Sequence, residues 1–323
     1  MAELDAICRP IASELRATAR AVSRSLGAAA ALSGCRPGAA PDNGGKMLRP
    51  ALLLLVARLF KADAGLAVRL ASAIELVHAA SLIHDDVIDA ADTRRGAPAA
   101  RALLGAADAV LLGDVIFTGA FADLVSLGDY RMTADIARAA GDICAGEVRQ
   151  NRSKGTFAVS HAAYLRTVGL KTASLYRSCA VLAALAGRAP RAQVLSAARL
   201  GAHFGLSFQI TDDLLDLTGD PAKTGKPNGC DLAQGKTTLP LILYFRMIGP
   251  SRSRLLRRSL VLGDCDARAR LLCELARPRV TNAVRAAAKR HSRLAVSELA
   301  RLPRARETAN LTALCRFAVE RSY

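Results

Sequence analysis

The sequence of 323 residues contains no tryptophan, and aromatic residues make up only 4% of it. Its hydrophobic residues, 51% of the chain, are mostly alanine and leucine. Both are strong helix formers, whereas the β-branched and aromatic residues typical of sheets are sparse, so an all-β fold is not expected. Charged residues at 23% give a globular balance that argues against general disorder.

Paired cysteines and long apolar runs are also missing. The eight cysteines are scattered without a C-x-x-C pair, and no secretory apolar segment opens the chain. We therefore expect reduced thiols in a cytoplasmic protein. No uninterrupted apolar run reaches 18 residues, since candidates such as 51–57 are short and flanked by arginine. A membrane-spanning segment is therefore not expected.

Acidic residues are outnumbered 28 to 45 by basic ones, which gives a net charge of +17. Of the basic residues 37 are arginine, a bias that resembles codon composition as much as function. A basic surface attracts nucleic acid, anionic lipid and phosphorylated substrates. A basic nucleic-acid-binding helical protein is one alternative. However, the basic residues are spread along the chain and no helix-turn-helix or aromatic-interleaved basic patch stands out, so we expect no nucleic-acid partner.

Apolar periodicity predicts helices along almost the whole chain and no strand. Glycine- and proline-rich loops are expected at 34–45 and 218–232, and a break at 96–98. The predicted helices cover 1–33, 49–60, 65–91, 99–106, 108–127, 131–150, 161–186, 191–217, 233–247, and two or three helices in the last eighty residues. Without an internal repeat or strong linker, one all-α domain over residues 1–323 is the simplest interpretation.

An acidic cluster lies at the end of the apolar helix predicted at 65–91, and consists of Asp85, Asp86 and Asp89. Asp85 and Asp89 are four residues apart and share one helix face, where like charges repel. A cation between them removes this cost, and Mg²⁺ is suitable because it combines one or two carboxylates with phosphate oxygens and water.

A second cluster, Asp212, Asp213 and Asp216, repeats the arrangement 127 residues later. One such cluster can be a solvated helix end, but two on strongly apolar helices are hard to explain as surface. Basic residues accompany both clusters, namely Lys46, Arg49, Arg94, Arg95, Lys171, Lys223, Lys226 and Lys236. Carboxylates that need a divalent ion, among cations that need a polyanion, indicate a metal–diphosphate substrate. The chain has no P-loop motif, so we expect this site to be built on helices.

Several motifs together resemble the trans-isoprenyl (polyprenyl) diphosphate synthases, in particular the octaprenyl and solanesyl types. In order and spacing, these are GGKMLRP, LIHDDVIDAADTRRG, GEVRQ, LKTASLY, FQITDDLLDLTGD and GKPNGCDLAQGKTTLP. The resemblance covers residues 40–245, and the C-terminal ALCRFAVERSY is similar to the family's last helix. It implies an isoprenoid-synthase-type helical bundle around a deep central cavity, usually a homodimer.

The resemblance also implies roles for individual residues. Asp85 and Asp89, with Asp86 in support, would hold Mg²⁺ on the allylic diphosphate. Asp212 and Asp216 would hold a further Mg²⁺, with Asp213 nearby. The allylic diphosphate would be bound by Arg94, Lys171 and Lys226, with Lys236 closing over it. Isopentenyl diphosphate would be bound by Lys46, Arg49, His78 and Arg95. Thr172 and Gln209 would lie near the developing allylic cation. This cation forms when the C1–O bond of the allylic diphosphate ionises, and the isopentenyl alkene then attacks it. Mg²⁺, lysine and arginine would stabilise the charge on the leaving diphosphate.

Two positions depart from the family pattern. Met47 stands where the family often has arginine, and Cys230 stands where many members have an acidic residue. Because Lys46, Arg49 and Asp231 are present and the acidic clusters are intact, we expect an active enzyme.

Small residues before the first acidic cluster bear on product length. In the family, bulky aromatic residues four or five positions before the first aspartate make products short. This chain has Ala80 and Ser81 there, with Val77 further down the same helix and Phe117 as a lower floor. We therefore expect a product longer than geranylgeranyl diphosphate. The family resemblance implies a farnesyl or geranylgeranyl primer and a product used for quinone side chains. The alternative is that Ala80 and Ser81 only allow close helix packing and the product has geranylgeranyl length.

The same helical fold is compatible with two further kinds of enzyme. The chain could be the catalytic subunit of a heteromeric prenyl synthase, which the sequence does not exclude. A terpene cyclase is disfavoured, because it has no isopentenyl diphosphate for the GGKMLRP and Arg94–Arg95 motifs to bind. Whichever enzyme it is, peripheral contact with a membrane surface is also expected, since a long prenyl product must enter lipid.

Overall fold

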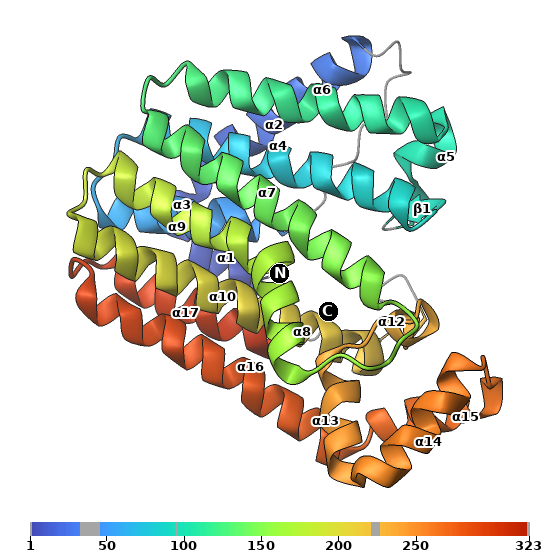
Figure 1. Ribbon diagram of the computed structural model, residues 1–323. Coiled ribbons are helices and arrows are strands. Elements are labelled where there is room, and N and C mark those ends of the chain that lie inside the picture. The colour runs from blue at the N-terminus through green and yellow to red at the C-terminus, as the bar shows by residue number, and fades with distance from the viewer. Residues whose placement is uncertain (1, 33–45, 95, 221–226, 322–323) are drawn as a thin grey trace. The chain divides into compact units, whose positions relative to one another are not determined.

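The computed structural model describes residues 2–32, 46–94, 96–220 and 227–321, and nearly all regular structure there is helical (Figure 1). The predicted all-α fold is confirmed. The strands within these ranges are the two-residue β1 (Thr93–Arg94) and β2 (Ala97–Pro98), which pair antiparallel at the predicted helix break.

The described chain forms two compact units, each assembled from separated segments. The first unit contains residues 1–140, 178–198 and 299–311, and the second contains 141–177, 199–298 and 312–323. Helices α7 (Tyr130–Ser153), α9 (Ser174–Ala186), α10 (Arg191–Thr218) and α17 (Glu307–Glu320) contribute residues to both.

The first unit is built around α4 (Ala64–Ile88), which packs against α2 (Ala12–Leu32), α3 (Leu48–Leu59) and α5 (Ala100–Leu104) and runs alongside α6 (Ala106–Val125) (Figure 1). Asp63 begins α4, because its carboxylate accepts a hydrogen bond of 2.8 Å from the Leu66 backbone N–H. The remaining elements of this unit are α1 (Ala2–Cys8), η1 (Arg9–Ile11) and η3 (Leu299–Arg301).

Helix α4 bears on the expectation that no segment spans a membrane. It is long and apolar enough, by length and composition alone, to cross a membrane, with a mean hydropathy of 1.6 over its most apolar 18-residue window. Counting uninterrupted apolar runs missed it, because Glu75 and other polar residues interrupt the run. In the structure 61% of that window is buried inside the protein, as in the core helix of a globular unit.

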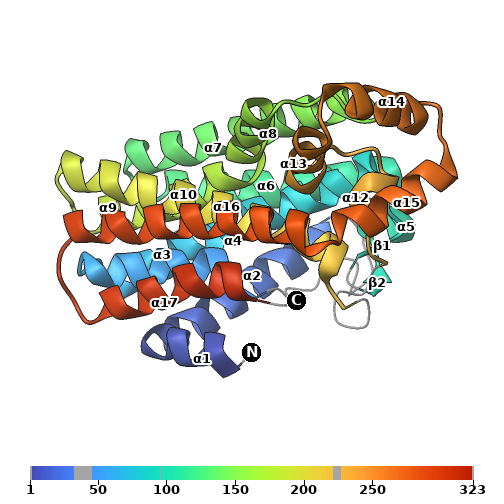
Figure 2. The same ribbon diagram turned by 90° about the horizontal axis from the view of Figure 1, so that it is seen from below.

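The second unit has a core in which α8 (His161–Val168), α10, α13 (Leu239–Ile248) and α16 (Pro278–Glu298) meet, centred on residues such as Ile210, Leu239 and Val284. Its further elements are the π-helical η2 (Gly169–Ala173), α12 (Cys230–Ala233), α14 (Pro250–Val261) and α15 (Cys265–Leu275). Helix α16 runs alongside α10, and the two are joined by a contact between His203 and His291 (Figure 2).

Helix boundaries in the second unit differ from the prediction in three places. The helix predicted at 161–186 contains the π-helical turn η2. The helix predicted at 233–247 is replaced by α12 and α13, because Gly235 has φ +73° and Pro240 lies in the first turn of α13. Within the described residues, the last eighty positions contain α14, α15, α16 and α17 after the end of α13, where two or three helices were predicted.

Candidate active site

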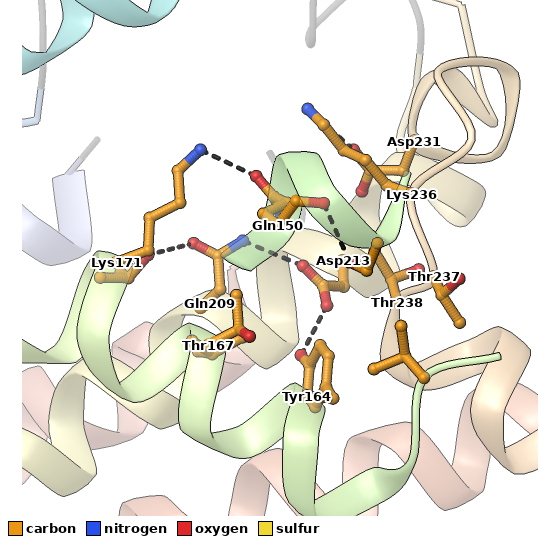
Figure 3. A pocket seen from close by; sticks show the side chains of 14 residues that line it. Gln150, Tyr164, Thr167, Lys171, Gln209, Asp213, Asp231, Lys236, Thr237 and Thr238 are labelled. Atoms are coloured by element: carbon orange, nitrogen blue, oxygen red, sulfur yellow. Dashed lines mark hydrogen bonds and ion pairs between the residues drawn. The ribbon is translucent and has the colours of Figure 1, made fainter. Parts of the chain in front are cut away.

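A cavity of about 120 Å³ in the second unit is lined mainly by polar side chains (Figure 3). They come from α7, α8, η2, α10 and the segment that precedes α13. Five residues that the sequence predicted for the site line it together: Lys171, Thr172, Gln209, Asp213 and Lys236. Three separate motifs therefore meet in one pocket.

The π-helical turn η2 presents Lys171 and Thr172 to this pocket. Two glycines let neighbouring helices approach it closely. A Cβ at Gly146 of α7 would lie 2.5 Å from the Lys171 nitrogen, and one at Gly205 of α10 would lie 2.6 Å from the Ala173 Cα. Such contacts are too short for any side chain, so both positions require glycine. Single π-helical turns are common at functional sites.

A chain of hydrogen bonds fixes the pocket's side chains relative to one another. The Thr172 hydroxyl donates to Gln209 Oε1 at 2.9 Å, and Gln209 Nε2 donates to Asp213 Oδ1 at 2.9 Å. The Tyr164 hydroxyl donates to the other carboxylate oxygen of Asp213 at 2.5 Å. Donors thus converge on Asp213, and the two ends of the Gln209 amide cannot exchange without breaking two bonds.

The Asp213 carboxyl is buried, and this environment disfavours its charged form. Burial, followed by the nearby charge of Asp231, raises the pKa of Asp213 to about 8, against the opposing effect of its two donors. Burial and the Asp213 charge also raise the pKa of Tyr164 well above its ordinary value. The pocket therefore favours a cation beside these carboxylates.

Two ammonium groups supply part of that positive charge. Lys171 Nζ donates to Gln150 Oε1 at 2.9 Å (Figure 3). It also pairs with the buried Glu147 carboxylate of α7. Lys236 Nζ lies 3.9 Å from Asp231 Oδ1. The loop that carries Lys236 is held near the end of α7 by a hydrogen bond of 2.8 Å from Gly155 N–H to the Gly235 carbonyl.

Asp212 and Asp216 have different surroundings from Asp213. Asp212 Oδ1 accepts a hydrogen bond of 2.7 Å from Arg321, whose buried guanidinium also stacks 4.0 Å above the Phe208 ring. Asp216 is buried and accepts a bond of 3.2 Å from the Asp231 backbone N–H. In this structure Asp216 thus anchors the segment that leads to Lys236.

Sequence reasoning missed Tyr164, Glu147, Gln150 and Arg321, and it noted Asp231 only as the carboxylate that the loop retains. Glu147 and Gln150 lie within GEVRQ, and Arg321 lies within the C-terminal ALCRFAVERSY. Both segments carried the family resemblance, so the signal was present, but no role was assigned to these side chains. Tyr164 had no such signal, because its partner Asp213 is 49 residues away.

In the first unit, Asp85, Asp86 and Asp89 lie at the C-terminal end of α4. This is the negative end of the helix dipole, and the last turn of α4 contains no basic residue to balance it. Arg94 compensates the buried Asp86 through two hydrogen bonds of 2.7 and 2.6 Å from Nε and Nη2. Arg94, predicted to bind the allylic diphosphate, therefore contacts a carboxylate of the first cluster here.

The residues predicted to bind isopentenyl diphosphate are placed at the start of α3 and within α4. Lys46 directly precedes Met47, which has φ +50° as the N-cap of α3, and Arg49 lies in the first turn. His78 is half-buried on α4. Arg49 acts electrostatically on the buried Cys179. Burial raises the pKa of this thiol, and Glu75 adds to the increase, whereas the positive charge of Arg49 opposes it.

The residues predicted to limit product length lie on α4 and α6 of the first unit. Val77 and Ala80 are fully buried on α4, and the half-buried Ser81 donates to the His78 carbonyl at 2.8 Å. Phe117 on α6 is half-buried and lies against Phe121, with ring centroids 4.8 Å apart.

Two predicted site residues, Arg95 and Lys226, lie outside the described residues. Within the described ranges, no group of three or more histidine, cysteine, aspartate or glutamate side chains is close enough to hold a metal ion by itself. The predicted metal ligands Asp85 and Asp89 belong to the first unit, and Asp212 belongs to the second. Their assignment as ligands stays a prediction.

Comparison with known proteins identifies the class. The family model for polyprenyl synthetase matches residues 39–269, and the chain belongs to this family. This confirms the predicted family and enzyme class, a trans-polyprenyl diphosphate synthase.

Individual relatives are consistent with this assignment. The chain is 42% identical over 199 residues to heptaprenyl diphosphate synthase component 2 of Geobacillus stearothermophilus, and this match spans 62% of each protein. It is 32% identical over 283 residues to octaprenyl diphosphate synthase of Haemophilus influenzae, covering 87% of this chain and 86% of that one. A crystal structure of polyprenyl synthase from Caulobacter crescentus, complexed with calcium and isoprenyl diphosphate, matches with a TM-score of 0.89 and 31% identity over 99% and 98% of the two chains.

Proposed function

We propose that this protein joins isopentenyl diphosphate to a farnesyl or geranylgeranyl diphosphate primer and makes a medium- or long-chain all-trans polyprenyl diphosphate for quinone side chains. The observation that carries the proposal is the pocket in which Lys171, Thr172, Gln209, Asp213 and Lys236 meet. It combines ammonium groups for a diphosphate with oxygen atoms for an allylic cation.

We further propose Mg²⁺ as the metal. The donors present are carboxylate oxygens, which suit a hard divalent cation, and the Caulobacter relative binds calcium together with isoprenyl diphosphate. Asp85 and Asp89 on α4 and Asp212 on α10 would hold it, and Asp86 would keep Arg94 beside them. When bound, the metal neutralises charge on the diphosphate oxygens.

The chain's own residues then act at the bond that breaks. Lys171 and Lys236 stabilise the negative charge that builds on the leaving diphosphate as the C1–O bond ionises. The hydrogen of the Thr172 hydroxyl is engaged by Gln209, so Thr172 can present oxygen lone pairs to the developing cation. The isopentenyl alkene attacks this cation, and the proton lost from the product passes to the released diphosphate.

The product length follows from α4 in this proposal. Ala80 and Ser81 leave the face below Asp85 without a bulky side chain, and the similar relatives include heptaprenyl and octaprenyl synthases. Ala80→Phe should shorten the product by one or more isoprene units. Because Ala80 is fully buried, the larger ring could also cost about 1–3 kcal/mol of stability, so the half-buried Ser81→Phe is the parallel variant. Unchanged products from both folded variants would disprove this role for α4.

A homodimer in the cytoplasm is the proposed state. The dimer is supported by α6, which exposes the apolar side chains of Val110, Leu111 and Val125. This helix carries few charges, since it contains no basic residue and three acidic ones. A helix that is apolar on its exposed side is normally covered by another surface. The second candidate is a catalytic subunit of a heteromeric enzyme, which the name "component 2" of the Geobacillus relative favours.

A product assay tests the reaction. Purified protein would be incubated with Mg²⁺, labelled isopentenyl diphosphate and either farnesyl or geranylgeranyl diphosphate, and the dephosphorylated products would be sized by chromatography and mass. We expect a ladder that ends in one long polyprenol and disappears with a chelator. Activity only after addition of a partner subunit would favour the heteromer, and a ladder that stops at geranylgeranyl would contradict the proposed length.

A further inference from the structure

Helix α14 (Pro250–Val261) has an outward face on which basic and aliphatic side chains alternate. Leu255, Val261 and the C-cap residue Leu262 are 69%, 58% and 75% exposed. Arg254 and Arg258 are exposed beside them. These residues are spaced three or four apart, which places them on one side of the helix.

The opposite face of α14 attaches the helix to the core of the second unit. Leu260 is buried in that core, and the Arg257 guanidinium lies 4.6 Å above the ring of Phe245 on α13. Helix α14 also packs against α15, next to α13 (Figure 1). The outward residues are therefore presented on a fixed support.

The surrounding segment carries more than half of the protein's excess charge. Residues 246–293 contain thirteen basic and three acidic residues, so 48 residues contribute +10 of the total +17. Basic residues occur along the whole chain, as expected, but they are denser in this segment. The charge is concentrated in the part of the sequence that includes the exposed aliphatic side chains of α14.

We propose that α14 is a docking surface for an anionic lipid bilayer. Arginine attracts anionic headgroups, and exposed aliphatic side chains can enter the boundary between headgroups and acyl chains, which is the pattern of an interfacial helix. A nucleic acid would explain the arginines but would leave Leu255, Val261 and Leu262 exposed to water. The reason for such docking rests on the proposed function, because a polyprenyl product is insoluble in water and must enter lipid. Binding to vesicles itself does not require catalysis.

The test is flotation of the full-length protein with vesicles. We expect binding to vesicles of equal parts phosphatidylglycerol and phosphatidylcholine at low salt, and much weaker binding to pure phosphatidylcholine. At about 1 kcal/mol for each basic residue near an anionic surface, Arg254→Gln with Arg258→Gln should weaken partitioning roughly 30-fold. Leu255→Ser with Leu262→Ser should weaken it by about tenfold or more.

A matched control changes the same residue types elsewhere. Leu195 is 50% exposed in the first unit and lies near the exposed Arg188 and Arg191, so Leu195→Ser with Arg188→Gln and Arg191→Gln should bind like wild type. Equal losses in both sets, or no vesicle binding by wild type, would refute the proposal. The proposal would also be refuted if the α14 variants kept full vesicle binding and instead lost binding to RNA or association with a second copy of the chain. All variants should retain the product ladder in detergent. A missing ladder in wild type would therefore contradict the proposed reaction, and not the docking surface.

Discussion

At the scale of single residues, Tyr164 shows how one hydroxyl can orient a reactive group that it does not touch. Its ring is 4% exposed and packed in the core of the second unit, and its hydroxyl donates to Asp213. Asp213 in turn holds the Gln209 amide, which accepts the hydrogen of Thr172. Tyr164 is therefore a positioning residue at the start of this chain of bonds.

Tyr164→Phe should keep the packing and remove only the donor. Because the pKa of Asp213 is raised to about 8, its carboxyl is mostly uncharged at neutral pH. A hydrogen bond between neutral groups contributes about 0.5–1.5 kcal/mol, so we expect kcat to fall about 2- to 10-fold with a smaller change in KM. Steady-state kinetics with the matched control Tyr244→Phe, which removes a hydroxyl from α13, would measure this. A wild-type kcat in Tyr164→Phe would show that Asp213 and Gln209 keep their orientation without the hydroxyl.

Residue identities could be predicted where motifs carried them. Lys171, Thr172, Gln209, Asp213 and Lys236 were all expected at the site, and the structure brings them into one pocket. Their contacts could not be predicted. Whether a buried carboxylate is held by a tyrosine, an arginine or a backbone N–H depends on which helices pack together, and sequence periodicity does not contain that information.

At the scale of helices, the contact between α10 and α16 is sensitive to acid. His203 Nδ1 and His291 Nδ1 are 3.2 Å apart. Burial, followed by the nearby charges of His203, Arg290 and His161, lowers the pKa of His291 to about 4. Burial also lowers the pKa of His203, against the nearby Glu298 and together with Arg199 and Arg290. Both rings are therefore neutral at neutral pH.

The sign of the pH effect follows from this shift. Above about pH 6.5, the ordinary pKa of histidine, neither the folded nor the unfolded state protonates His291, and its contribution to stability is complete. As the pH falls from 6.5 towards 4, only the unfolded state binds the proton, so the folded state is destabilised.

After discounting for the half-buried ring, we expect His291 to account for a loss of about 1 kcal/mol in the free energy of unfolding between pH 7.5 and 5. Urea unfolding of wild type and His291→Gln at the two pH values would measure this loss. An equal pH dependence in both proteins would contradict the assignment.

Helix boundaries separate what local sequence determines from what packing determines. The break at 96–98 and the long helices α4, α6 and α10 were predictable, because glycine, proline and apolar periodicity act locally. The π-helical turn η2 was not predictable, since residues 161–186 keep a continuous helical pattern through it. Gly146 and Gly205 approach this turn closely through tertiary contacts, which local sequence patterns do not predict.

At the scale of the whole molecule, the unexplained feature is the exposed apolar side of α6. Leu111 is 59% exposed, and Val110 and Val125 are exposed on the same helix. Inside the first unit, the other side of α6 packs against α4, so this helix is apolar on both sides. A second copy of the chain would remove the outer side from water.

Leu111→Asp should therefore convert a dimer into a monomer, because a carboxylate in an apolar interface is desolvated without a partner. Light scattering after size exclusion should give twice the 33.9 kDa of one chain for wild type and a single chain mass for the variant. Leu195→Asp, at another exposed leucine of the same unit, should stay dimeric. A wild type that is monomeric and forms the full product ladder alone would exclude this role for α6. A monomer that gains activity only with a different subunit would instead make the same apolar face the docking surface of a heteromeric enzyme.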